Sequence, residues 1–216
     1  MFKAAETTET QEHAWWLRAL LVMQAPRAVF AALRDDSDAA ASARQEPVTA
    51  IVFLVGLAAG LGAARNATLL DDPDFDGTLV AVWAVAAGGV QGLFGYWIVG
   101  AAVFAGLSAV GDPGRYRHVR HLLAYAAVPL ALSLFIVWPL RLAVYGGDVF
   151  RGGGAHEGAG AFALDALEVG LLLWSAGLLI IGVRVERGWS WHRSLAAVGI
   201  TVAVLIAVAA AIALVA

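Results

Sequence analysis

Four charged residues are candidates for chemistry because each lies at the edge of a long apolar stretch. Arg65 and Arg141 end two such stretches, and Asp165 and Glu168 lie near the start of a third, which begins near Phe162. An unpaired charge within a membrane boundary costs on the order of several kcal/mol. Because Asp165 and Glu168 are three residues apart, they share one helix face. We therefore predict that the two arginines pair with the two acids as an ion-pair cluster at one level of the bundle.

Other interpretations of these four residues stay open. Each side chain could reach the headgroups on its own, and Glu168 could take up protons in a coupled transport cycle. Acids in the first turns of a helix are also favoured by its dipole. The sequence has no HExxH zinc motif, no pair of membrane aspartates or of serine and histidine placed for proteolysis, and no phosphate-binding glycine loop. We expect neither an enzyme nor a cofactor.

Three histidines raise the question of a metal. His118 and His121 are three residues apart and could share a helix face with His192. Because Arg117 and Arg120 are interleaved with the first two, we favour contacts between these histidines and lipid phosphates. No metal site is predicted.

The composition identifies the class of protein. Apolar residues make up 61% of the chain and charged residues only 14%, whereas soluble domains contain about half and about a quarter. This composition is typical of an integral membrane protein. The chain has no cysteine, which excludes disulfides, thiolate chemistry and iron–sulfur ligation.

Five apolar stretches predict an all-α fold, a polytopic membrane helical bundle with five transmembrane helices. Thr78 to Val110 is 33 residues long without a charge, about 50 Å of helix against a hydrocarbon core of about 30 Å. We predict one long helix, bent near its glycines, because two spans would place the basic and acidic loops on the same side. The other expected spans are 47–66, 122–140, 162–183 and 194–216.

Small residues and prolines predict how these helices pack. Gly56 and Gly60 form a GxxxG spacing that allows close approach of another helix, more often within a chain than between chains. Pro129 and Pro139 are expected to bend the third helix. The predicted helix-packing residues are Gly56, Gly60, Gly88, Gly92 and Pro129.

The segment before the first span divides into three parts. Residues 1–12 are expected to be a disordered tail, and Pro26 should divide residues 13–36 into two short helices. These helices either lie at the headgroup level or pack on the cytoplasmic end of the bundle. Residues 35–46 are predicted to be a flexible linker. The predicted domains are therefore 1–46, a cytoplasmic tail with short interfacial amphipathic helices, and 47–216, the five-helix transmembrane domain.

The distribution of basic residues predicts the orientation. Two short basic turns, 111–121 and 184–193, face the same side, and with the N-terminal segment they hold eleven of the fourteen Lys and Arg residues. Short loops rich in arginine stay in the cytoplasm. We therefore expect the N-terminus inside and the C-terminus outside, with a cytoplasmic basic face made by Arg115, Arg117, Arg120, Arg184, Arg187 and Arg193.

Several features together carry a resemblance to a known family. They are Ala25-Pro26-Arg27, the long second span, the basic turn leading into Ala124-Tyr125-Ala126-Ala127-Val128-Pro129, and a final helical pair around Leu172, Trp174 and Trp191-His192-Arg193-Ser194. This order of parts resembles the prokaryotic form of the Yip family, named for Ypt/Rab-interacting proteins. The resemblance implies five spans and a cytoplasmic N-terminus, and its eukaryotic members act in vesicle traffic and bind Rab-type GTPases.

The chain departs from those members in lacking their longer N-terminal region with its Asp-Leu-Tyr-Gly-Pro type motif, so GTPase binding is not carried over to it. Thirteen arginines against one lysine indicate a GC-rich prokaryotic source. The expected location is therefore the plasma (inner) membrane of a prokaryote.

Two functions remain at the level of the sequence. The first is a non-catalytic membrane organiser or accessory subunit that acts through its basic cytoplasmic face. The second is a small permease with a polar path along Gln91, Tyr96, Tyr125, Ser133 and Ser175, although such groups more often form interhelical hydrogen bonds. The expected partners are the lipid bilayer, with anionic headgroups as candidates, and a membrane protein or a second copy of the chain. Nucleic acid is not expected.

Overall fold

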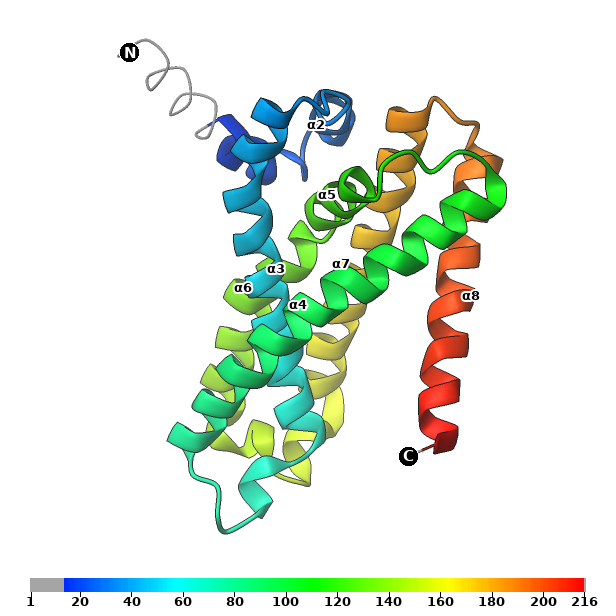
Figure 1. Cartoon of the computed structure of the whole chain (residues 1–216). Coiled ribbons are helices and arrows are strands. Elements are labelled where there is room, and N and C mark those ends of the chain that lie inside the picture. Colours follow the sequence, from blue (N-terminus) through cyan, green and yellow to red (C-terminus); the bar gives the residue numbers. More distant parts are fainter. Residues whose placement is uncertain (1–13, 216) are drawn as a thin grey trace. The chain divides into compact units, whose positions relative to one another are not determined.

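The computed structural model describes residues 14–215, and these form helices and short loops with no strand among them. The tail predicted at residues 1–12 lies outside the described part. Residues 14–21 are helical. The further elements, shown in Figure 1, are α2 (Pro26–Ala32), α3 (Asp38–Asn66), η1 (Leu69–Asp71), α4 (Gly77–Val110), α5 (Tyr116–Ala126), α6 (Val128–Tyr145), η2 (Gly146–Phe150), η3 (Gly154–His156), α7 (Gly158–Arg187) and α8 (Trp191–Val215).

Five segments are long and apolar enough to cross a membrane, as predicted: Asp38–Asn66, Gly77–Val110, Tyr116–Phe150, Gly158–Arg187 and Trp191–Ala211. The prediction of one long second span is also confirmed, because α4 is a single helix of 34 residues. The chain is therefore an all-α, multi-pass membrane protein.

The N-terminal segment forms two short helical stretches on either side of Pro26, as predicted. One face is packed against the chain, since Trp15, Val22 and Phe30 are almost completely buried. The other face of the first stretch is exposed, with Leu17 and Leu20 more than 60% accessible. The segment therefore packs on the chain through one face and leaves apolar side chains exposed on the other.

The prediction of a flexible linker at residues 35–46 is wrong. Helix α3 begins at Asp38, so Pro47 lies inside it instead of starting the first span. The Ser37 hydroxyl accepts a hydrogen bond from the Ala40 backbone N–H at 3.3 Å, as an N-cap residue does. The alanines that follow have the highest helix propensity of any residue. The charges and small residues of this stretch therefore belong to a helix.

The two basic turns are much shorter than predicted. The first is confined to residues 111–115, because α5 begins at Tyr116, and the second to residues 188–190, between α7 and α8. Gly114 and Gly188 adopt positive φ angles of 64° and 65°, which glycine reaches without strain. Every predicted arginine of the basic face except Arg115 is therefore held on a helix.

The third span is interrupted next to Pro129, one of the two prolines expected to bend it. Helix α5 ends at Ala126 and α6 begins at Val128, which places Pro129 in the first turn of α6, where its missing N–H costs no hydrogen bond. Pro139 lies inside α6. The span also continues to Tyr145, beyond the predicted end at Leu140.

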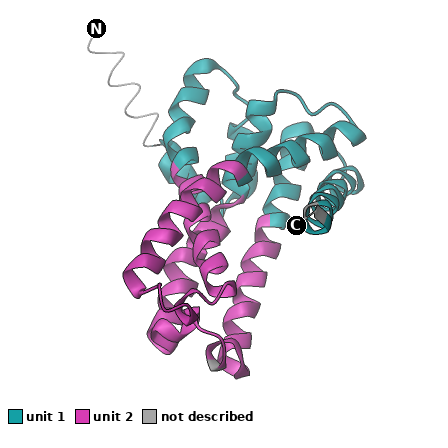
Figure 2. Ribbon diagram, turned by 60° about the horizontal axis from the view of Figure 1, so that its bottom comes forward, with its two compact units in different colours: residues 1–49, 95–126, 176–216 teal, residues 50–94, 127–175 magenta. Residues whose placement is uncertain are grey.

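Contacts divide the chain into two compact units (Figure 2). Unit 1 comprises the residues up to Thr49, Gly95–Ala126 and the residues from Ala176 onward; unit 2 comprises Ala50–Phe94 and Ala127–Ser175. Ten of the thirteen arginines belong to unit 1, and Arg65, Arg141 and Arg151 belong to unit 2. Most of the basic residues are therefore concentrated in one of the two units that the contacts define.

Candidate functional site

Unit 2 brings the four predicted members of the ion-pair cluster into contact. Asp165 accepts hydrogen bonds from both arginines: Oδ1 lies 3.0 Å from Arg65 Nη1 and 2.6 Å from Arg141 Nη2. Glu168 Oε2 lies 3.2 Å from the same Arg141 nitrogen. The Arg141 side chain is only 1% exposed, whereas that of Asp165 is 42% exposed. Asp165 is therefore the shared partner that compensates a buried guanidinium.

Three helices supply this ion-pair cluster. Arg65 lies in the last turn of α3, Arg141 in α6, and both acids in α7. The expectation that the acids lie in the first turns of their helix is wrong, because α7 begins at Gly158, about two turns before Asp165. The dipole effect fades beyond the first turn. The arginines, and not the helix end, therefore stabilise these carboxylates.

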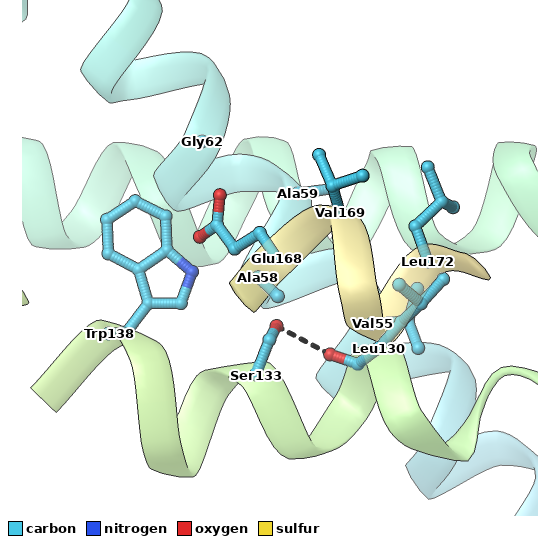
Figure 3. Close-up of a pocket in the computed structure, with 10 residues that line it drawn as sticks. All are labelled: Val55, Ala58, Ala59, Gly62, Leu130, Ser133, Trp138, Glu168, Val169 and Leu172. Atoms are coloured by element: carbon cyan, nitrogen blue, oxygen red, sulfur yellow. Dashed lines mark hydrogen bonds between the residues drawn. The ribbon is translucent and has the colours of Figure 1, made fainter. Parts of the chain in front are cut away.

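A cavity of about 290 Å³ lies beside Glu168 in the same unit. Figure 3 shows the Glu168 carboxylate near the Trp138 indole, among side chains that are mostly apolar. The Ser133 hydroxyl donates to the Leu130 carbonyl of its own helix at 2.7 Å. Gln91 does not line this cavity and is exposed on α4. The polar groups proposed for a permeation path therefore do not meet here.

The predicted helix-packing glycines also lie together in unit 2, where α3 contacts α4. A Cβ atom added to Gly60 would lie 2.8 Å from the Cα of Gly88, and one added to Gly92 would lie 2.9 Å from the Cα of Gly56. Backbone atoms cannot move aside as a flexible side chain can. The contact between the two helices therefore requires glycine at these positions.

Unit 1 contains a charged pocket of about 320 Å³, lined by Arg34, Asp36, Arg115, His118, Glu186 and Arg187. These residues come from α7, from α5 and from the loops that precede α3 and α5. His118 lies between the two acids, with Nε2 3.0 Å from Glu186 Oε1 and Nδ1 3.7 Å from Asp36 Oδ1. The pocket therefore combines three guanidinium groups with two carboxylates.

Asp36 is the acidic centre of this charged pocket. Its carboxylate lies 3.3 Å from a guanidinium nitrogen of Arg115 and 3.3 Å from one of Arg117. Burial raises the pKa of Asp36, but nearby positive charge, chiefly from His118 and Arg117, lowers it more. The net pKa lies below the usual value for an aspartate, so Asp36 stays ionised at neutral pH.

Several arginines of unit 1 donate to carbonyl groups at or near helix ends instead of to carboxylates. Arg193 Nη2 donates to the Val110 carbonyl, the last of α4, at 2.9 Å. Arg44, which is fully buried, donates to the Leu33 and Asp35 carbonyls at 3.1 and 2.8 Å. Arg34 donates to Val185 near the end of α7. Helix ends leave carbonyls without partners, and these arginines satisfy them.

Two predicted arginines of the basic face lie on aromatic rings. The Arg120 guanidinium carbon is 3.6 Å from the Trp97 ring centroid and 5.1 Å from that of Tyr116. The Arg184 guanidinium lies 4.6 Å from the Trp191 ring centroid. Such cation–π contacts fix the side chain while leaving N–H groups available to other acceptors. Both residues therefore have a structural contact in unit 1.

The three histidines considered as metal ligands lie in different environments. His118 and His121 are buried, while His192 is exposed. Within residues 14–215, no three side chains of the ligating types are arranged to hold an ion. The contacts of His118 are with acids, not with other histidines.

Sequence reasoning missed Asp36, Glu186, Arg34 and Arg44. Glu186 interrupts a basic run between Arg184 and Arg187, which is a signal for a local counter-charge. Arg44 carries no such signal, because the sequence around it predicts a flexible linker. The partners of Asp36 lie 79 and 81 positions away, a distance at which no spacing rule operates.

Comparison with known proteins identifies the family. The family model described as the Yip1 domain matches residues 20–213. The chain belongs to this family. The Yip1 domain therefore covers α2 to α8 almost completely, and it includes the ion-pair cluster of unit 2 and the charged pocket of unit 1. No curated protein and no solved structure matches the chain.

Proposed function

We propose that this Yip-family protein is a non-catalytic membrane organiser or accessory subunit that acts through the basic surface of unit 1. The observation that carries the proposal is the placement of ten of the thirteen arginines in this unit. Arg27 and Arg115 are exposed there, and so are the apolar side chains of Leu17 and Leu20. Exposed arginines and exposed leucines in the same unit suit the headgroup region of a membrane with anionic lipids.

The orientation belongs to the same proposal. Unit 1 contains both short basic turns, and residues 1–46 are taken to be cytoplasmic, with the C-terminus outside. The membrane is taken to be the plasma membrane of a prokaryote. A reporter that is active only outside the cytoplasm should work after Ala216 and fail within 112–115. Activity within the turn would refute the orientation.

Lipid enrichment tests the functional part. The protein is reconstituted in nanodiscs of mixed phosphatidylglycerol and phosphatidylcholine, and the lipids retained after purification are quantified by mass spectrometry. Exposed arginines near an anionic surface contribute about 1 kcal/mol each, so Arg27→Gln with Arg115→Gln should cost about 2 kcal/mol and reduce the enrichment of phosphatidylglycerol by about thirtyfold. Unchanged enrichment would mean that the arginines only set the topology and would refute this role.

A further inference from the structure

The charged pocket of unit 1 differs from the rest of the basic surface because its arginines converge on one cavity. Arg34, Arg115 and Arg187 reach it from three different segments of the chain. The lining carries three guanidinium groups against two carboxylates, an excess of one positive charge before His118 is counted. A cavity of about 320 Å³ holds a small charged group and not a protein helix.

Much of the donor capacity of these arginines is not used inside the chain. A guanidinium has five N–H donors, and each of the three arginines engages its internal acceptor through one terminal nitrogen. These acceptors are the Val185 carbonyl for Arg34, the Asp36 carboxylate for Arg115, and the Pro113 carbonyl and Glu186 carboxylate for Arg187. In addition, Arg187 Nε is buried without a hydrogen-bond partner.

The two acids of the pocket act as supports. Asp36 holds Arg115, and Glu186 holds Arg187 at 2.8 Å. The contact with Glu186 fixes the Arg187 guanidinium, whose side chain is 19% exposed, whereas the contact with Asp36 orients the more exposed Arg115 only weakly. An arginine held in this way loses less rotamer freedom when it binds a ligand, which favours binding at a defined position.

From these observations we infer that the charged pocket is a discrete binding site for a phosphate group, held by Arg34, Arg115 and Arg187. Planar guanidinium forks match the oxygen atoms of phosphate bidentately. The ligand is either the headgroup of a phosphate-bearing lipid or a soluble phosphate compound. The inference deepens the proposed function and rests on it for the side of the membrane that the pocket faces.

Two titrations of the full-length protein separate the two sources. In the first, nanodiscs of phosphatidylcholine contain increasing amounts of phosphatidic acid, and native mass spectrometry counts the retained lipids. In the second, glycerol 3-phosphate is added to protein in nanodiscs of phosphatidylcholine alone, and Tm is measured. Saturation at one ligand in the first titration assigns a lipid, and a saturable rise of Tm in the second assigns a soluble phosphate compound.

Two variants that each remove one positive charge test whether the site is discrete. Arg115 lines the pocket and its side chain is 73% exposed, so we expect Arg115→Gln to leave the fold intact. Arg27 is exposed outside the pocket and provides the control. We expect Arg115→Gln to weaken saturable phosphate binding by about tenfold and Arg115→Lys to weaken it less. Arg27→Gln should leave this saturable binding unchanged, although it lowers the general enrichment of anionic lipid.

The possible outcomes distinguish this inference from the proposed function. Equal weakening by Arg27→Gln and Arg115→Gln, with general enrichment of anionic lipid, would overturn the discrete site and leave the basic surface standing. Saturable binding that only Arg115→Gln weakens, without general enrichment, would support the site and refute the wider surface. Absence of saturable binding in both titrations would overturn the site.

Discussion

Arg141 in unit 2 and Arg187 in unit 1 are both largely buried, with side chains 1% and 19% exposed, yet their positive charges are compensated differently. Arg141 contacts two carboxylates of one helix, Asp165 and Glu168. Arg187 contacts its neighbour Glu186 and donates to the backbone carbonyl of Pro113. Arg34 and Arg193, in the same unit as Arg187, also donate to backbone carbonyls.

This difference follows from what surrounds each group. A guanidinium among apolar helices needs a full counter-charge, because its desolvation is otherwise uncompensated. At a helix end, carbonyl groups with a partial negative charge accept hydrogen bonds without adding a formal charge. Unit 1 can therefore hold many arginines in place and still keep an excess of positive charge, whereas the ion-pair cluster of unit 2 is neutral.

The largest expected effect is in the ion-pair cluster. Asp165→Asn leaves two arginines without their shared carboxylate. We expect a loss of about 3 kcal/mol in the free energy of unfolding, at the lower end of the range for a broken buried ion pair, because Asp165 is 42% exposed. Glu168→Gln, which affects a single contact of Arg141, should cost less. Thermal unfolding in detergent measures both changes.

A double-mutant cycle provides the control for this prediction. Arg141→Met combined with Asp165→Asn removes the uncompensated charge, so the pair should be more stable than the sum of the two single losses predicts. If the two losses simply add, Asp165 does not compensate Arg141, and the contrast between the units fails.

The glycine contact in unit 2 gives the next largest effect. Gly60→Ala places a Cβ 2.8 Å from the Gly88 Cα, and such overpacking should cost about 2 kcal/mol. Gly62→Ala on the same helix is the matched control, because its Cβ meets no atom within 4 Å. There the higher helix propensity of alanine should leave stability unchanged or raise it slightly. Equal Tm values for the two variants would rule out a tight contact.

A smaller effect is expected at Asp36 on acidification. Its pKa is lower in the folded chain than its usual value near 3.9. The folded state therefore binds this proton more weakly, and Asp36 stabilises the fold above about pH 4 and loses that contribution as the pH falls through its folded pKa. Asp36→Asn should lower Tm at pH 6 and make Tm fall less between pH 6 and pH 3.

Asp38→Asn is the control, because the Asp38 side chain is 94% exposed and contacts Arg117 only at the surface. The same fall of Tm with pH in wild type and Asp36→Asn would show that the charge cluster around Asp36 does not contribute to stability.

The sequence was sufficient to predict the five spans but not the residues at which their helices begin and end. Long uncharged stretches such as Thr78 to Val110 have one stable solution in lipid, so α4 was predictable. The charges of the basic segment after Pro113 predict a turn. Yet His118, Val119, His121 and Leu122 are all buried on one side of α5, a helical spacing that was already visible in the sequence.

The ion-pair cluster shows the same limit at the level of a site. Four charges at the ends of apolar stretches were enough to predict that Arg65 and Arg141 lie near the acids of α7. The choice of Asp165 over Glu168 as the shared partner depends on the rotation of α7 about its axis, which side-chain packing sets. The charged pocket was even harder to predict from the sequence, because Asp36 and Glu186 become neighbours of His118 only in the folded chain.

The smallest expected effect concerns Arg115, and it sharpens the contrast between the units. Its contact with Asp36 is 3.3 Å long, but the Arg115 side chain is 73% exposed, and exposed ion pairs contribute about 0 to 1 kcal/mol. Arg115→Gln should therefore change the free energy of unfolding by less than about 0.5 kcal/mol, while it weakens phosphate binding. Denaturation of the same sample with and without glycerol 3-phosphate measures both quantities. A loss of stability comparable to that of Asp165→Asn would place Arg115 among the structural arginines and remove the reason for assigning it to a ligand.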